Sequence, residues 1–164
     1  MFKRVRKRFL NRKAISIMDL TIVSLLFLLC AYAGTYLFAS VMQETVVMQL
    51  NMIANSMVDV VSENRELSEA IQNKFKEDID RYTWYTGAYD IEYSEIEVSS
   101  DSINTNVIGT SHNGESIGDV MLTKNNLFRV EIVSSENTML TRVTQALGGT
   151  ATTQAIGFAE GCVD

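Results

Sequence analysis

The stretch that decides the fold is Arg12–Gln43, which reads RKAISIMDLTIVSLLFLLCAYAGTYLFASVMQ. It begins with the end of a basic cluster, continues through Asp19, and then has no charged residue from Leu20 to Gln43, a run of 24 residues. As an α-helix this run would be about 36 Å long, and roughly 20 apolar residues are enough to cross the hydrocarbon core of a bilayer. We therefore predict a transmembrane helix over residues 15–43, preceded by a basic leader over residues 1–14.

The charges on the two sides of this helix are of opposite sign. Seven of the 14 basic residues lie within the first 13 positions, whereas 19 of the 20 acidic residues lie beyond Gln43. Basic flanks stay in the cytoplasm, so we expect a single-span protein of the cytoplasmic membrane whose C-terminal part is exported. Binding to nucleic acid is disfavoured, because the acidic part would repel phosphates and the basic leader lies against lipid headgroups.

After the span, apolar residues recur at steps of three and four as far as Tyr82, which is the spacing of one helix face. The chain contains no proline, so we predict one continuous helix from Ile15 to Tyr82, whose second half, residues 44–82, is amphipathic. We expect its apolar stripe to pack on the chain's own domain or on a neighbouring helix. The stripe consists of Val46, Leu50, Ile53, Met57, Val60, Leu67, Ile71, Phe75 and Ile79.

Residues 83–164 are expected to form an exported β-rich domain. Alternating patterns predict strands over residues 89–98 (with a bulge), 117–122, 128–132, 139–143 and 154–158, a polar loop over 99–106 and a hairpin turn at 124–126. About 80 residues is close to the lower limit for a self-sufficient core, so one sheet face should pack on the amphipathic helix. The predicted fold class is α+β: a long N-terminal helix, membrane-spanning in its first half and amphipathic in its second, followed by a small antiparallel β-sheet head.

The segment Lys13-Ala14-Ile15-Ser16-Ile17-Met18-Asp19 resembles the class III signal of type IV pilins, and the chain looks closest to the TadE-like minor pilins. The resemblance covers residues 12–43 and the order of a long helix followed by a sheet. It implies cleavage by a prepilin peptidase between Ala14 and Ile15, with Asp19 at the position of the family's acid, the fifth mature residue. The chain differs from the usual pattern in having alanine rather than glycine before the cut and aspartate rather than glutamate as the acid.

The resemblance also implies a function and partners. The protein would be a structural subunit (pilin, minor pilin or pseudopilin) of a type IV or Tad-like filament or secretion apparatus, found in the membrane or in a cell-surface filament. Its partners would be the membrane, the prepilin peptidase during processing, and copies of itself or other pilin-like subunits.

Asp19 has two interpretations that do not depend on the family. A carboxylate at the centre of a membrane span costs up to about 2.5–3.5 kcal/mol, and somewhat less near the interface, so it requires a partner. After cleavage, the new α-ammonium group of Ile15 on a neighbouring subunit could pair with Asp19 and fix the axial register of packed helices. Alternatively, Asp19 turns toward the basic flank and pairs with Arg12 or Lys13.

The sequence does not predict an enzyme. His112 is the single histidine, and it lies in a predicted loop without a nucleophile and an orienting acid at recognisable spacing. Cys30 and Cys162 are too far apart in the predicted fold for a disulfide and do not have zinc-ligand spacing. Glu95 and Glu97 lack the ligand order of a calcium loop. We expect no cofactor, no metal ion and no small-molecule substrate.

A second functional hypothesis remains open from the sequence. The chain could be an uncleaved bitopic membrane protein whose stalk and β domain form a binding module in an envelope, secretion or conjugation complex. The apolar stripe would then mediate dimerisation as a coiled coil.

Overall fold

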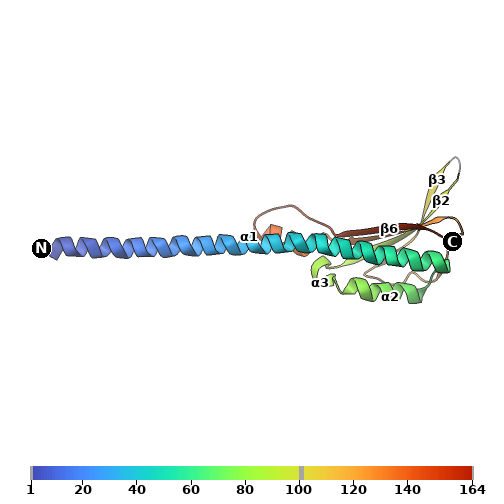
Figure 1. Cartoon of the computed structure of the whole chain (residues 1–164), viewed down its shortest axis with the longest axis horizontal. Coiled ribbons are helices and arrows are strands. Elements are labelled where there is room, and N and C mark those ends of the chain that lie inside the picture. Colours follow the sequence, from blue (N-terminus) through green and yellow to red (C-terminus); the bar gives the residue numbers. More distant parts are fainter. Residues whose placement is uncertain (1, 100–101, 164) are drawn as a thin grey trace. The chain divides into compact units, whose positions relative to one another are not determined.

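The computed structural model describes residues 2–99 and 102–163, with side chains described from Ile17 onward. Figure 1 shows a long helix followed by a head made of short helices and an antiparallel sheet. The elements in chain order are α1 (Phe2–Asn64), β1 (Glu66–Leu67), α2 (Glu69–Asp80), α3 (Thr83–Thr86), β2 (Tyr89–Val98), β3 (Ile103–His112), β4 (Val120–Met121), β5 (Leu127–Ser134), α4 (Met139–Ala146) and β6 (Ile156–Cys162). This is the predicted α+β fold class.

The chain divides into two compact units, residues 1–38 and residues 39–164. The first unit is helical as far as it is described. The second unit, which we call the head, contains the rest of α1 together with all the other elements. The head therefore begins at Ala39, within the predicted span and well before the boundary at residue 83 that the sequence suggested for the exported domain. The reason is that the second half of α1 supplies a large part of the head's own core.

The main sheet has four antiparallel strands in the order β3-β2-β5-β6. Strands β2 and β3 pair with a register shift between Tyr93 and Ser94, where Ile108 is the extra residue on β3. The shift coincides with the change of phase that predicted a bulge in β2, but the additional residue is in the partner strand. Along β5, alternate side chains are buried, as expected for a strand with one face on the core.

The buried face of the sheet packs against α1. Along β6 and the residue before it, the residues at alternate positions that face the core are small, namely Ala155, Gly157, Ala159 and Gly161. A β-carbon added to Gly157 would lie only 2.6 Å from Cβ of Leu50, so the absence of a side chain allows α1 to come close to the strand. Asn51 accepts a hydrogen bond from the backbone N–H of Phe158 through Oδ1 at 2.8 Å. The expectation that a sheet face packs on the amphipathic helix is thus confirmed.

The prediction of one continuous helix to Tyr82 is wrong. Helix α1 ends at Asn64, and Arg65 has the left-handed φ of 57° that stops a helix. Ser68 then caps α2, because its hydroxyl accepts a hydrogen bond from the N–H of Ile71. Proline is not needed for such a break, since a left-handed residue and a new N-cap produce it together. Residues 44–82 are therefore two helices joined by β1.

Gln72 ties α2 to the loop that precedes β4. Its side chain is buried, accepts a hydrogen bond from the N–H of Ile117 at 2.9 Å and donates one to the carbonyl of Gly118 at 2.7 Å. The N–H of Glu69, in the first turn of α2, is bonded to Asp119 Oδ1 at 2.7 Å. These long-range contacts hold residues 117–119 against the start of α2. Of the strand predicted over residues 117–122, only Val120 and Met121 therefore form a strand.

Three further predictions for the head are corrected. The segment expected as a polar loop over 99–106 belongs in its second half to β3, whose pairing with β2 satisfies the backbone although its side chains are polar. β4 is two residues long and pairs with β1, not with β5, so the hairpin expected around residues 124–126 is absent from the described pairing. The strand predicted over 139–143 is the helix α4, which Thr138 caps by accepting from the N–H of Thr141.

Candidate functional site

The segment Ile17–Phe38 is the most distinctive surface of the first unit. Every residue in it is exposed, although most are apolar, and Asp19 is its single charged residue. By length and composition it belongs to the one described helix that could cross a membrane. Twenty-two residues correspond to about 33 Å of helix. This length is closer to the 30 Å of a hydrocarbon core than the length of about 36 Å of the 24 uncharged residues that end at Gln43.

The serine and threonine hydroxyl groups in this segment are satisfied within the helix. Thr21, Ser24 and Thr35 each donate to the carbonyl four residues earlier, at 2.8 to 2.9 Å. Such bonds remove the unpaired donors that would be costly in a lipid environment. The polar residues other than Asp19 therefore do not argue strongly against membrane insertion.

The side chain of Asp19 is exposed. The predicted processing residues Ala14 and Ile15 lie outside the residues whose side chains the structure describes. The register role of Asp19 and the cleavage after Ala14 both remain predictions.

The predicted packing stripe is used within the head itself. Most of its residues are buried in a single core: Val46, Leu50, Met57, Leu67, Phe75 and Ile79. The remaining three, Ile53, Val60 and Ile71, are partly buried against that core. The stripe comes from three elements, because Leu67 lies in β1 and the residues after it lie in α2. A coiled coil through this face would have to displace the sheet.

Tyr85 marks the point at which the head begins on α1. Its side chain is buried, and its hydroxyl lies 2.9 Å from both the carbonyl of Ala39 and Oε1 of Gln43. Burial raises the pKa of Tyr85, and a weaker backbone hydrogen bond with Leu140 opposes this rise. Gln43 in turn donates to the carbonyl of Gln154 at 2.7 Å. Sequence periodicity could not find this junction, because its residues are far apart in the chain.

Replacing Tyr85 by phenylalanine should therefore destabilise the head. Gln43 would lose its buried donor, and the expected decrease in the free energy of unfolding is about 1–2 kcal/mol. Urea unfolding of the detergent-solubilised chain, followed by near-UV circular dichroism, measures this change. Tyr82→Phe is the matched control, because the Tyr82 hydroxyl makes a longer bond of 3.3 Å to Gln49 in a more exposed position. Equal losses for the two variants would contradict the importance of the Tyr85 junction.

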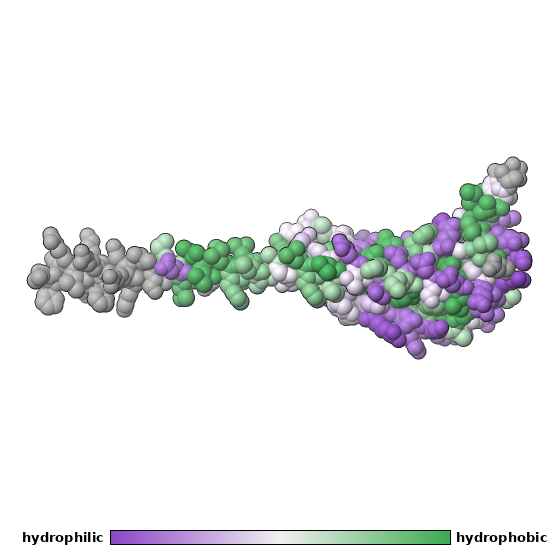
Figure 2. Space-filling model, in the orientation of Figure 1, coloured by the Kyte–Doolittle hydropathy of each residue, from purple (hydrophilic) through white to green (hydrophobic). Residues whose placement is uncertain are grey.

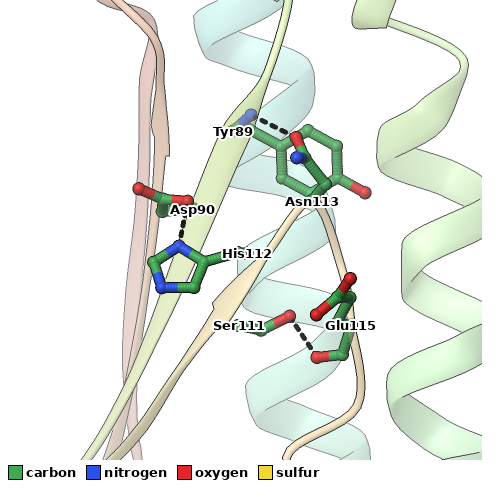
Figure 3. A network of polar contacts seen from close by, with 6 residues as sticks. All are labelled: Tyr89, Asp90, Ser111, His112, Asn113 and Glu115. Atoms are coloured by element: carbon green, nitrogen blue, oxygen red, sulfur yellow. Dashed lines mark hydrogen bonds and ion pairs between the residues drawn. The ribbon is translucent and has the colours of Figure 1, made fainter.

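His112 lies at the end of β3 rather than in a loop. Figure 3 shows its ring beside Asp90 of the neighbouring strand, with Nδ1 at 2.8 Å from Oδ1, and both side chains are exposed. The nearby hydroxyl of Ser111 donates instead to the carbonyl of Glu115 at 2.5 Å. Asn113 accepts from the N–H of Tyr89 and donates its own N–H to the carbonyl of Tyr89. These contacts close the end of the β2–β3 ladder and do not pair a nucleophile with a base.

Other kinds of site receive little support from the part of the chain that is described. No cluster of three or more histidine, cysteine, aspartate or glutamate residues suited to a metal ion occurs among the described residues. Cys30 and Cys162 are both free and exposed.

The candidate site is therefore the exposed apolar helix over residues 17–38 with Asp19 near its start. Three kinds of comparison with known proteins, against family models, curated proteins and solved structures, give no match for this chain.

Proposed function

We propose that this chain is a pilin-like structural subunit that is anchored in the cytoplasmic membrane by residues 17–38. In this proposal the N-terminus stays in the cytoplasm, a prepilin peptidase cuts after Ala14, and the head is exported. The subunit then assembles through its apolar helix into a type IV or Tad-like filament or secretion apparatus. The observation that supports the proposal most is the 22-residue exposed apolar helix directly before a head that uses the continuation of the same helix as its core.

Such an arrangement suits a helix with two roles. The apolar side chains of residues 17–38 are exposed and require either lipid or neighbouring helices to cover them. The stripe from Val46 to Val60 is already covered by the head, so it is not free to mediate assembly. Contacts between subunits would therefore involve residues 17–38 and exposed positions of the head. The alternative of a coiled-coil stalk through the stripe has no such support.

The direct test of processing is N-terminal sequencing of the protein extracted from the membrane of cells with an active prepilin peptidase. We expect a mature chain that begins at Ile15. An Ala14→Leu variant should accumulate in the unprocessed form, because the cut requires a small residue before it. A mature chain that still begins at Met1 in such cells would rule out the pilin route and favour the uncleaved bitopic protein.

Replacing Asp19 by alanine tests the assembly role. We expect normal insertion and normal folding of the head, but a lower fraction of the protein in sheared filaments, because the partner of the Ile15 ammonium would be missing. The ratio of filament-associated to membrane-associated protein on immunoblots measures the effect. Thr21→Ala is the matched control, since its hydroxyl bonds only to its own helix at the carbonyl of Ile17 in the contacts described. Incorporation of Asp19→Ala at the level of Thr21→Ala would defeat the register role.

A further inference from the structure

The end of the head at which Ala39 lies has an apolar surface formed by α3, α4 and the residue after α4. We call it the basal surface and define it as Trp84, Met139, Arg142, Val143, Ala146 and Leu147. Apart from Leu147, these residues line a shallow, open depression. The two bulkiest apolar groups are well exposed, with 54% of Trp84 and 44% of Leu147 accessible to solvent.

We propose that the basal surface lies in the outer interface of the membrane, in contact with phospholipid headgroups and the upper part of the acyl chains. This inference rests on the proposed anchoring through residues 17–38. It adds that the head is a peripheral membrane-binding element in its own right, held at the bilayer by a second contact besides the span.

Tyr85 connects the basal surface to Ala39. Tyr85 is adjacent in sequence to Trp84, and its hydroxyl lies 2.9 Å from the carbonyl of Ala39. Ala39 directly follows the last residue of the candidate span. The headgroup region on each side of a bilayer is roughly 5–7 Å deep, so the hydroxyl of Tyr85 lies at this depth if residues 17–38 span the bilayer. Within the head, Figure 1 shows α3 at the opposite end from the β2–β3 hairpin.

The chemistry of the exposed groups is the second step. Tryptophan is enriched at membrane interfaces, because its ring is largely apolar and its N–H needs a polar partner. The Trp84 ring meets Tyr85 edge-on, with centroids 5.7 Å apart. The buried ring of Tyr85 therefore supports the exposed ring of Trp84. On α4, Met139, Val143 and Ala146 are spaced three and four residues apart, which gives this short helix one apolar side.

The distribution of charge is the third step. Residues 82–89 and 137–159 contain one charged residue, Arg142, and of the 19 acidic residues of the head only the exposed Glu44 lies within two helical turns of Ala39 on α1. Arg142 reaches the carbonyl of Trp84 at 3.4 Å through Nη2, so its cation lies within the basal surface. A basic residue near a lipid surface gains about 1 kcal/mol from anionic headgroups, and acidic residues would be repelled. On the visible face of the head in Figure 2, pale side chains gather at the end where Figure 1 places α3, and purple ones gather along the side of α2 and at the opposite end.

Trp84 is the only tryptophan of the chain, so the unmodified protein reports on its own basal surface. The full chain is reconstituted into vesicles of phosphatidylethanolamine and phosphatidylglycerol, with acyl chains that are either unmodified or brominated close to the headgroup, and a third preparation brominated near the ends of the acyl chains serves the reporter at position 27. Bromine quenches indole fluorescence on contact. We expect the emission of Trp84 to lose intensity in the brominated vesicles, and its maximum to lie at a shorter wavelength than in the urea-unfolded chain.

Two reference variants calibrate the loss of Trp84 fluorescence. Phe27→Trp with Trp84→Phe places the indole in the middle of the candidate span. Met121→Trp with Trp84→Phe places it at a residue that is 72% exposed and pairs with Glu66 just beyond the end of α1, about 38 Å along the helix from Ala39. Trp84 should be quenched far more than the reporter at position 121.

Each other outcome has a distinct meaning. Quenching at position 27 without quenching at Trp84 leaves the anchor intact and overturns the interfacial contact. Absence of quenching at position 27 overturns the anchoring itself and the inference with it. If bromine has no effect on Trp84 but acrylamide quenching of Trp84 weakens as the protein-to-lipid ratio rises, the basal surface binds another copy of the chain, and the lipid contact is overturned.

Discussion

Replacing Phe128 by alanine is expected to lower the free energy of unfolding of the head by about 3–5 kcal/mol. Phe128 is the second residue of β5 and is completely buried, and its ring is stacked on that of Tyr93 with centroids 6.4 Å apart and planes within 9°. Truncation would remove a large apolar group and leave a cavity between the sheet and the rest of the core. Because domains of this size are stable by about 5–15 kcal/mol, this loss is a large fraction of the total stability.

The measurement is urea unfolding of the full chain in detergent, followed by near-UV circular dichroism. Phe158→Ala is the matched control, because Phe158 lies on the neighbouring strand β6 but is 44% exposed. The guanidinium of Arg129 lies 5.3 Å from the centre of its ring, an arrangement worth about 0.5–1 kcal/mol at an exposed site. Similar losses for the two variants would mean that the sheet does not bury the face assigned to the core.

Replacing Gly157 by alanine has the second largest expected effect, a loss of about 1–3 kcal/mol or more. The added β-carbon would lie 2.6 Å from Cβ of Leu50 and 2.7 Å from its carbonyl carbon. The latter atom belongs to the backbone of α1, so no change of side-chain conformation can relieve the clash. The helix and the strand would have to move apart along the contact that holds the head together. The midpoint of urea unfolding measures the loss.

Gly161 provides a control for the cause of this effect. A β-carbon there would lie 2.5 Å from Cγ1 of Val58, which is a side-chain atom. Adding Val58→Ala should therefore partly restore the stability of Gly161→Ala, whereas adding Leu50→Ala should not restore Gly157→Ala. Gly34→Ala, where nothing lies within 4 Å of the added carbon, should leave the head unchanged. Rescue of Gly157→Ala by Leu50→Ala would contradict the close contact of the two backbones.

These predictions concern the contact between α1 and the sheet, which the sequence indicated only in part. The spacing of Val46, Leu50 and Met57 predicted an apolar helix face, and this face is buried in the head. Periodicity is a local property, and it does not state which surface covers the face. The small residues Gly157, Ala159 and Gly161 on β6 are a signal that was available in the sequence, because their period of two matches one face of a strand.

Local signals failed where tertiary contacts decided the conformation. The stripe continues in phase beyond Asn64, yet Arg65 takes a left-handed conformation and the chain turns into β1 and α2. The polar side chains of residues 104–106 resemble those of a loop, but this part of β3 is held by its backbone pairing with β2. A strand was predicted over residues 139–143, whereas the cap at Thr138 and the contacts with Thr153 favour a helix over Met139–Ala146.

The candidate site was likewise determined in part by local sequence signals and in part by tertiary contacts. The sequence by itself determined the apolar helix, the placement of Asp19 near its start and the excess of acid beyond it, because hydropathy and charge are sums over neighbouring residues. The tertiary structure alone decided where the exposed helix ends and the head begins. That boundary depends on the hydroxyl of Tyr85 reaching Ala39 and Gln43, more than 40 positions earlier in the chain. Contacts across such separations are made only when the sheet and the helices pack together, so no window along the sequence contains them.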